Sequence, residues 1–214
     1  MGNQMLGVKA EIEKAVKGKE KVVEKVLAVM LAGGHVLLED IPGVGKTTLA
    51  MAIAKSMSLS YRRVQFTPDV LPSDIVGFSM YDQTSKSFKY QEGAVLCNLF
   101  LADEINRTSP KTQSALLEVM EEGTVTVDGV TRPLPDPFTV IATENPLGSS
   151  GTQMLPESQL DRFMVCLSMG YPEHEAAVQI LKDNASKPIT HLVPAISIDE
   201  FVALRKLTNE MYVH

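Results

Sequence analysis

The sequence predicts an α/β fold, and three observations support that prediction. The 214 residues are 44% apolar and only 6% aromatic, which indicates a core built from aliphatic side chains. Short apolar runs alternate along the chain with segments of helical periodicity. One apolar run, residues 36–39, is followed by glycines and then by a helical segment, an order that α/β proteins repeat. The length allows one full domain and part of a second.

Two helices are expected before the first strand. Residues 6–17 place Ile12 and Val16 on one helical face, and Gly18 interrupts the pattern. A second amphipathic segment follows, in which apolar residues recur at helical intervals from position 22 to 31. Two glycines end it, and the first strand then begins.

The segment 36–50 has the order that polyphosphate binding requires. Gly43 and Gly45 let the backbone approach phosphates closely, because neither residue has a Cβ atom. The next helix begins at Lys46, so its N-terminal dipole adds partial positive charge at the same place. Lys46 would reach the β- and γ-phosphates of a nucleotide, and the Thr47 hydroxyl would bind Mg²⁺.

Asp40 departs from the usual G-x-x-x-x-G-K-[ST] pattern, because it stands where the first glycine is expected. Aspartate tolerates unusual backbone angles better than most residues, and we therefore expect the loop to form. The alternative is an ordinary strand–turn–helix corner that binds nothing.

An apolar strand at residues 98–104 ends in two carboxylates, Asp103 and Glu104. A buried strand would present Asp103 at the carboxyl end of the sheet, beside the phosphate loop, where it would hold Mg²⁺ directly or through water. Glu104 would point differently and polarise an attacking water. Alone, an Asp-Glu pair after a strand is more often a helix cap or a solvated corner. The upstream loop reverses that preference.

The rest of the chain continues the alternation of strands and helices. The region 67–93 is long for a plain connection, which suggests an insertion with its own function. Asn145 ends an apolar strand, and its neutral amide could bond a γ-phosphate or a water, although Asn-Pro alone is only a turn signal. Arg162 follows a prolyl loop, where a surface ion pair is the ordinary interpretation. The other expected elements are strands at 61–66, 88–90, 138–143 and 164–169, helices at 46–57, 110–122 and 157–163, and a hairpin at 124–132 around Asp128-Gly129.

After Pro172 the character changes to two helices, at 173–184 and 198–212. The last four residues carry no stop signal, so we expect the chain to be cut within a second domain.

Five segments together resemble the MoxR family of AAA+ ATPases, and the resemblance extends over nearly the whole chain. The run from Leu101 to Glu118 is the most specific of them. The segments are GHVLLE at 34–39, PGVGKT at 42–47, LADEINR at 101–107, PKTQSALLE at 110–118 and LPESQLDRF at 155–163.

The resemblance implies the fold of a P-loop NTPase of the AAA+ class, a three-layer sandwich whose parallel five-stranded sheet has the order 5-1-4-3-2. Residues 1–170 would form the ATPase core, and residues 171–214 would begin a helical lid. An insert in helix 2 would lie at about 79–91, and a hairpin before sensor 1 at about 123–136. Both inserts typically face the partner protein.

The resemblance also implies roles for individual residues. Lys46 and Thr47 match Walker A, Asp103 and Glu104 match Walker B, and Asn145 matches sensor 1. Arg162 matches the arginine finger, which acts on the nucleotide of the neighbouring subunit in a homo-oligomeric ring, usually a hexamer. The rest of the implied ATP site consists of Pro42, Gly43, Val44, Gly45 and Thr48 in the loop, with Val16 and Gly18 at the start of the adenine pocket. No sensor 2 arginine matches before His214.

By this resemblance the chain would bind ATP and Mg²⁺ and use hydrolysis for chaperone-like remodelling, activation or metal-cofactor maturation of a client. That client is often a von Willebrand factor A-domain protein. A nucleic-acid-dependent motor and a magnesium-chelatase-like ATPase subunit are the alternatives, and a nucleotide-binding switch is a third. The net charge of −6 and a hairpin whose one basic residue is Arg132 argue against nucleic acid.

Several classes of protein are disfavoured by what the sequence lacks. Residues 1–11 have no basic cluster before an apolar run, so no signal peptide is expected, and no window approaches a membrane span. The four histidines have no metal-ligand spacing. Cys97 and Cys166 would lie on strands 3 and 5 of the implied sheet, too far apart for a disulfide. We expect two free, buried thiols and a cytoplasmic protein.

Overall fold

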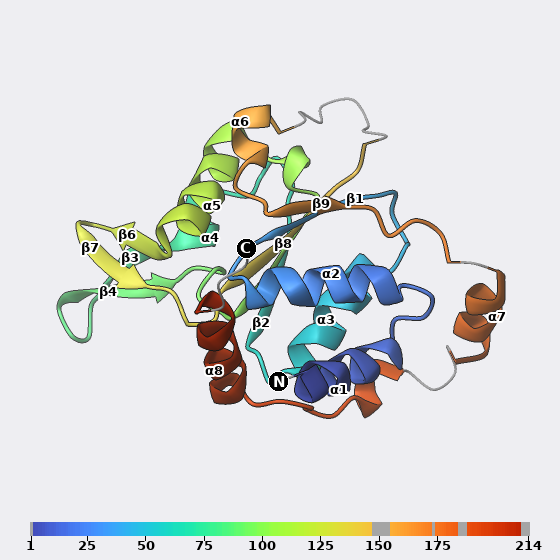
Figure 1. The fold of residues 1–214 in the computed structure, drawn as a ribbon. Coiled ribbons are helices and arrows are strands. Elements are labelled where there is room, and N and C mark those ends of the chain that lie inside the picture. The colour runs from blue at the N-terminus through green and yellow to red at the C-terminus, as the bar shows by residue number, and fades with distance from the viewer. Residues whose placement is uncertain (1, 147–154, 173, 184–187, 211–214) are drawn as a thin grey trace.

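The computed structural model describes residues 2–146, 155–172, 174–183 and 188–210. At its centre lies a parallel sheet of β1 (Val36–Glu39), β2 (Tyr61–Gln65), β5 (Leu99–Asp103), β8 (Thr139–Glu144) and β9 (Val165–Leu167). The strands lie in the order β2-β5-β8-β1-β9 and pair in parallel throughout (Figure 1). Numbered along the sheet strands alone, that order is 5-1-4-3-2 from the C-terminal strand, so the predicted fold class is confirmed.

Helices cover both faces of this sheet and complete three layers (Figure 1). One face carries α1 (Gly2–Glu13), α2 (Glu20–Leu31), α3 (Lys46–Ser56) and α8 (Ile198–Asn209). The other carries α4 (Pro72–Val76), α5 (Pro110–Glu122) and the short α6 (Glu157–Leu160). Beyond β9 lie α7 (His174–Asp183) and the short 3-10 helix η2 (Pro188–His191), and a second 3-10 turn, η1 (Ile105–Arg107), follows β5.

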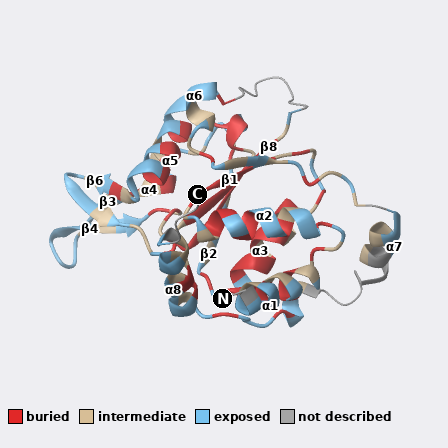
Figure 2. Cartoon of the chain, in the orientation of Figure 1, coloured by how far each residue is buried: buried red, intermediate tan, exposed pale blue. Residues whose placement is uncertain are grey.

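The two hydrophobic clusters of the core follow directly from the alternation of side chains along each strand. Leu99 and Leu101 face the cluster beneath α1–α3, whereas Phe100 and Ala102 face the cluster beneath α5. Because both faces are covered, the central strands are continuous apolar runs, and they form the buried band in Figure 2. Because all five strands are parallel, their carboxyl ends lie at the same edge of the sheet.

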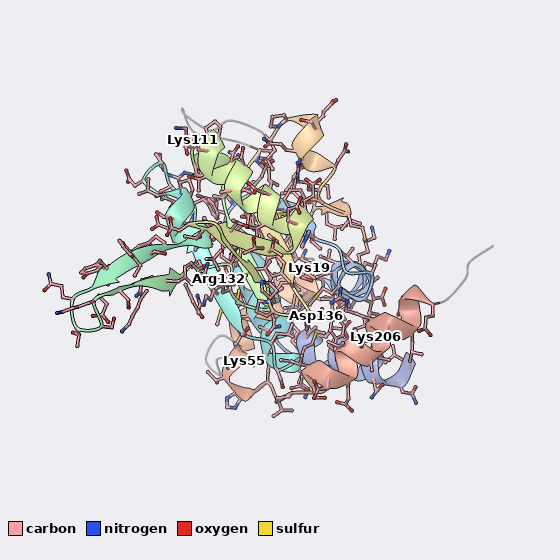
Figure 3. The ribbon with its side chains drawn as sticks, turned by 90° about the vertical axis from the view of Figure 1, so that its left-hand side faces the viewer. Lys19, Lys55, Lys111, Arg132, Asp136 and Lys206 are labelled. Atoms are coloured by element: carbon pink, nitrogen blue, oxygen red, sulfur yellow. The ribbon has the colours of Figure 1, made fainter. Side chains whose placement is uncertain are left out.

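Two hairpins project from the body. β3 (Gly77–Asp82) pairs with β4 (Ser87–Glu92), and β6 (Thr124–Val127) pairs with β7 (Val130–Pro133). The second hairpin was predicted. In the first, the sequence indicated only a short strand near 88–90, because exposed strands of mixed polarity have no clear period. Figure 3 shows the first hairpin extending away from the core, with Arg132 near its base.

Some expected boundaries and one expected burial were wrong. The helix at 157–163 ends at Leu160, and the helix expected to reach residue 212 is described as far as Asn209. Both cysteines are free, as predicted, but Cys166 is exposed rather than buried. The reason is that β9 is an edge strand, so one side of it lacks a neighbouring strand. Residues 147–154 lie outside the described residues.

Within the described part of the chain, none of the helices combines the length and the apolar character that crossing a membrane requires.

Candidate functional site

A cleft of roughly 380 Å³ lies at the carboxyl ends of β1, β2 and β5. Its size is within the range of small-molecule sites, about 300–1,000 Å³. We call it the phosphate cleft, and its lining residues are Pro42, Gly43, Gly45, Lys46, Thr47, Arg63, Gln65, Asp103 and Glu104. The fold thus brings together seven of the residues singled out from the sequence, although they come from two segments about sixty residues apart.

The loop between β1 and α3 has the conformation that its glycines allow. Gly43 has φ +88° and Gly45 has φ +97°, and both values lie in the left-handed region that disfavours other residues. Gly45 is also the residue before the first turn of α3, and no described side chain caps that turn. The helix thus starts beside the cleft without a side-chain cap among the described residues, and the N–H groups of such a helix start are the donors that an anion site uses.

Lys46 is almost fully buried, and its ammonium turns back toward the loop. Its Nζ atom donates to the carbonyl oxygens of Asp40 at 2.7 Å and Ile41 at 3.3 Å. Burial lowers the pKa of Lys46, while the nearby carboxylates of Asp103, Asp40 and Glu104 act in the opposite direction. A phosphate group arriving in the cleft would offer this cation a stronger partner than two carbonyls.

Asp103 has a partner on each carboxylate oxygen. The Thr143 hydroxyl donates to Oδ1 at 2.7 Å, and Arg63 donates to Oδ2 through Nη2 at 2.7 Å and Nε at 3.2 Å. The backbone N–H of Glu104 donates to the same Thr143 hydroxyl at 2.9 Å, which joins β5 to β8. Asp103 is therefore held in one orientation at the edge of the sheet.

Glu104 is the first residue after β5, and its φ of +58° is a left-handed value rare for a non-glycine residue. Successive residues of a strand point to opposite faces, but this turn lets Glu104 and Asp103 line the same cleft. The Oε2 atom of Glu104 accepts from Gln65 at 2.9 Å and from Arg107 at 2.6 Å. The strain is of the kind that functional sites retain.

Asp40 stabilises the loop in a way the sequence did not indicate. Its backbone does not adopt a positive φ, so tolerance of unusual angles is the wrong reason for its presence. Its buried carboxylate instead accepts from the Ser168 hydroxyl at 3.2 Å, the Gly170 N–H at 3.2 Å and the Met169 N–H. Asp40 thus fastens the phosphate loop to the segment that leaves β9.

Four of the expected nucleotide residues lie outside the lining of the phosphate cleft. Val44 packs into the core, and Thr48 lies half-buried on α3. Val16 is buried in the core beneath α1–α3. Gly18 packs against α7, because a Cβ atom added to Gly18 would lie 2.8 Å from the Cβ atom of Ala176. Gly18 therefore lies where the core meets the C-terminal helices.

Asn145 follows β8, which lies between β5 and β1, but it is not among the lining residues of the phosphate cleft, and Arg162 belongs to another part of the surface. The Asn145 carbonyl accepts from Asn106 Nδ2 at 3.3 Å. Arg162 pairs with Glu121 of α5 through Nη2 at 2.8 Å and Nε at 3.1 Å. It lines a separate hollow that we call the arginine face, composed of Met120, Glu121, Ser158, Asp161 and Arg162.

Residues 35–165 match the profile of the ATPase family associated with various cellular activities (AAA). The chain is 52% identical over 204 residues to YeaC of Bacillus subtilis, covering 94% of this chain and 64% of YeaC. It is 40% identical over 204 residues to chaperone MoxR1 of Mycobacterium tuberculosis, covering 95% and 54% of the two chains. The chain belongs to the MoxR family of AAA ATPases.

A solved structure has the same fold. A putative ATPase from Cytophaga hutchinsonii has a TM-score of 0.89 and 37% identity to this MoxR-family chain, covering 99% of it and 64% of the other protein. The chain thus spans between about half and two thirds of the length of these relatives.

Three residues at the site of this MoxR-family chain were missed from the sequence. Arg63 and Gln65 alternate along β2, and polar alternation on an edge strand is indistinguishable from an ordinary solvated face. The parallel register sets Gln65 opposite Asp103, and only the fold supplies that pairing. Thr143 was expected to end a strand, but nothing in the sequence indicated its bond to Asp103.

Proposed function

We propose that this chain binds ATP in the phosphate cleft and hydrolyses it. The meeting of Lys46, Thr47, Asp103 and Glu104 in one cleft is the observation that carries the proposal. Nucleotides bind α/β proteins at the carboxyl ends of parallel strands, beside a helix N-terminus. Lys46 and the first N–H groups of α3 would bind the β- and γ-phosphates, with Pro42, Val44 and Thr48 completing the loop around them.

Thr47 and Asp103 would hold Mg²⁺. A hydroxyl and a carboxylate are the hard oxygen ligands that this ion prefers, and both line the cleft. When bound, the ion would neutralise negative charge on the phosphate oxygens. Thr143 would keep the Asp103 carboxylate oriented toward it.

Glu104 would act as the base. It accepts a proton from a water whose oxygen bonds to the γ-phosphorus, while the bond from phosphorus to the β–γ bridging oxygen breaks and ADP leaves. The Asn145 amide would orient the water or the γ-phosphate without adding charge. Because the left-handed turn after β5 brings Glu104 into the cleft, the base needs no further rearrangement of the backbone.

Arg162 would complete the site from a neighbouring subunit. It lies on the arginine face rather than in its own phosphate cleft, which supports action in trans within a homo-oligomeric ring, the hexamer that the family resemblance implies. Val16 and Gly18 would border the adenine. Residues 171–214 would belong to the helical lid.

We further propose that hydrolysis drives chaperone-like remodelling or maturation of a client protein. The name of the Mycobacterium relative supports a chaperone role. The β3–β4 hairpin exposes apolar side chains that a client could cover, namely Phe78, Met80, Tyr81 and Phe88. A von Willebrand factor A-domain protein is the class of client we propose. Two unbridged cysteines are in keeping with a cytoplasmic location.

A nucleic-acid motor is the less favoured alternative. Arg132 is the one basic residue between Thr124 and Asp136. Its guanidinium lies 3.9 Å from the ring centroid of Tyr90, so its charge already has a partner. A hairpin that grips nucleic acid needs cations directed at phosphates. A magnesium-chelatase-like ATPase subunit would use the same phosphate cleft. The identity of the client would distinguish it from a chaperone-like ATPase.

The Glu104→Gln variant tests the hydrolytic step. It should bind ATP with unchanged affinity by calorimetry, while phosphate release falls by about 10²–10⁴-fold, because the base is lost and the cleft is kept. Glu118→Gln, an exposed position on α5, is the matched control and should hydrolyse normally. Unchanged phosphate release from Glu104→Gln would contradict the assignment of the base.

A further inference from the structure

Arg63 occupies the carboxylate oxygen that a metal ion would need. Both Nη2 and Nε of Arg63 donate to Oδ2 of Asp103, at 2.7 and 3.2 Å. The other oxygen, Oδ1, already accepts from Thr143. Both oxygens of Asp103 are therefore hydrogen-bonded, and Oδ2 carries the two bonds from Arg63.

The charges in the cleft explain why an arginine lies there. Asp103 is only 8% exposed, and a carboxylate so far from water needs a cation beside it. Lys46 is close enough for the two charges to interact, but its ammonium donates its hydrogen bonds to the carbonyls of Asp40 and Ile41 and not to Asp103. Among the described residues, the cation bonded to Asp103 is Arg63.

Arg63 is also free to move. Its side chain is 42% exposed, and it lies on β2, an edge strand of the five-stranded sheet. Its Nη2 atom reaches Gln65 at 2.8 Å as well as Asp103, so the guanidinium has a second polar partner within the same cleft. The guanidinium can therefore leave the buried Asp103 when another cation takes its place there, and it keeps a partner in Gln65.

We propose that Arg63 is a stand-in cation, which neutralises Asp103 in the metal-free cleft and gives up Oδ2 when a divalent ion binds. A guanidinium and a divalent ion repel each other, so both cannot use that oxygen together. Arg63 is thus a positioning residue that acts through Asp103. The inference rests on the proposed function, because it takes the metal site and the phosphate site to be the same cleft.

The test compares nucleotide affinity with and without metal in Arg63→Met. Without metal, in EDTA, the variant leaves Asp103 unneutralised beside the phosphates, and calorimetry should find ADP binding about tenfold weaker than in the native chain, the size of one lost charge-assisted hydrogen bond. With saturating Mg²⁺ the ion neutralises Asp103 in both proteins, and the two affinities should agree within about threefold. Equal weakening in both conditions, or none in either, would overturn the proposal.

A second measurement needs no nucleotide. Mn²⁺ binding followed by electron paramagnetic resonance should be tighter in Arg63→Met than in the native chain, because the competing guanidinium is gone. Equal or weaker Mn²⁺ binding would also overturn the proposal. If the native chain binds no ADP in either buffer, the proposed function fails, and the Mn²⁺ comparison still decides the role of Arg63.

Two further variants separate charge from structure. Arg62→Met is the matched control, since Arg62 is equally exposed on the same strand but pairs with Glu92 outside the cleft, and it should behave as the native chain does. Arg63→Lys keeps the positive charge but cannot donate from two nitrogen atoms to Asp103. Its affinity for ADP without metal should lie between those of Arg63→Met and the native chain. A Lys variant as weak as the Met variant would argue against neutralisation of charge as the role.

Discussion

In the phosphate cleft, Lys46 and Asp103 are buried and hydrogen-bonded within their own chain, whereas Arg162 on the arginine face belongs to an ion pair that is more exposed to solvent. Lys46 and Asp103 are each 8% exposed. The side chains of Arg162 and Glu121 are 33% and 58% exposed. The fold of a single chain therefore fixes the positions of Lys46 and Asp103. Arg162 is instead held by an ion pair with Glu121 that is open to solvent.

This difference indicates how the proposed work is divided between subunits. A surface ion pair contributes about 0–1 kcal/mol, so Arg162 can exchange Glu121 for a phosphate at little cost. Moving Lys46 or Asp103 would instead disrupt hydrogen bonds that hold the phosphate loop and join β5 to β8. We therefore assign nucleotide binding to the phosphate cleft, whose buried residues are fixed. We assign activation of hydrolysis to the arginine face, where Arg162 can change partners.

The largest effect is expected from Arg162→Ala, which tests whether the arginine face activates hydrolysis. If the arginine acts on a neighbour's nucleotide, phosphate release should fall by about 10³–10⁵-fold while the affinity for ATP stays the same. Folding stability should hardly change, because only an exposed pair is removed. Phosphate release and calorimetry measure the two effects.

Lys111→Ala is the control for Arg162→Ala, because Lys111 is an exposed cation at the other end of α5 (Figure 3). It should hydrolyse ATP normally. Weakened ATP binding by Arg162→Ala would indicate that Arg162 serves its own cleft and would contradict the division described above.

Lys46→Ala tests the phosphate cleft, and it should weaken ATP binding rather than slow hydrolysis alone. Loss of one buried cation from the phosphate site should weaken ATP binding by about 10–100-fold, measured by calorimetry. Lys55→Ala, which removes an exposed lysine from the same helix, should bind like the native chain (Figure 3). Native affinity in Lys46→Ala would count against the loop as the phosphate site.

His35 joins β8 to α5, and its titration should produce the smallest effect. Its Nδ1 atom accepts from the Val140 N–H at 3.0 Å, and its Nε2 atom lies 3.1 Å from the Met120 carbonyl of α5. Burial lowers the pKa of His35 below its usual 6.5. The native state therefore prefers the neutral ring, and this contribution to stability is complete above pH 6.5 and is lost as the pH falls below it.

Urea unfolding at pH 7.5 and pH 5.5 measures this loss, which should be on the order of 1 kcal/mol. His35→Gln cannot be protonated at that position, so its stability should change less between the two pH values. His174→Gln, an exposed position on α7, should follow the native chain. An equal drop in all three proteins would mean that other groups carry the acid sensitivity.

Much of the fold could be predicted because long apolar strands and a glycine-bearing loop leave few alternatives. The phosphate loop, Asp103 and Glu104 were recognised from residue types and spacing, since their chemistry is local to the sequence. The helix α4 and the strand β3 were missed, because a five-residue helix has too short a period to detect and β3 exposes apolar residues.

Contacts between distant segments account for the rest of what was missed. The bonds from Arg63 to Asp103 and from Gln65 to Glu104 depend on the register between β2 and β5. Asp40 bonds to residues about 130 positions away. The exposure of Cys166 depends on β9 lying at an edge of the sheet. No local pattern encodes any of these.

The most direct test of a divided site mixes two inactive variants. Glu104→Gln lacks the base but keeps Arg162, and Arg162→Ala lacks the arginine but keeps the base. In a mixed ring, an intact cleft of one variant would meet an intact arginine of the other. The account predicts that phosphate release, absent from each variant alone, returns on mixing. A mixture as inactive as its components would contradict it.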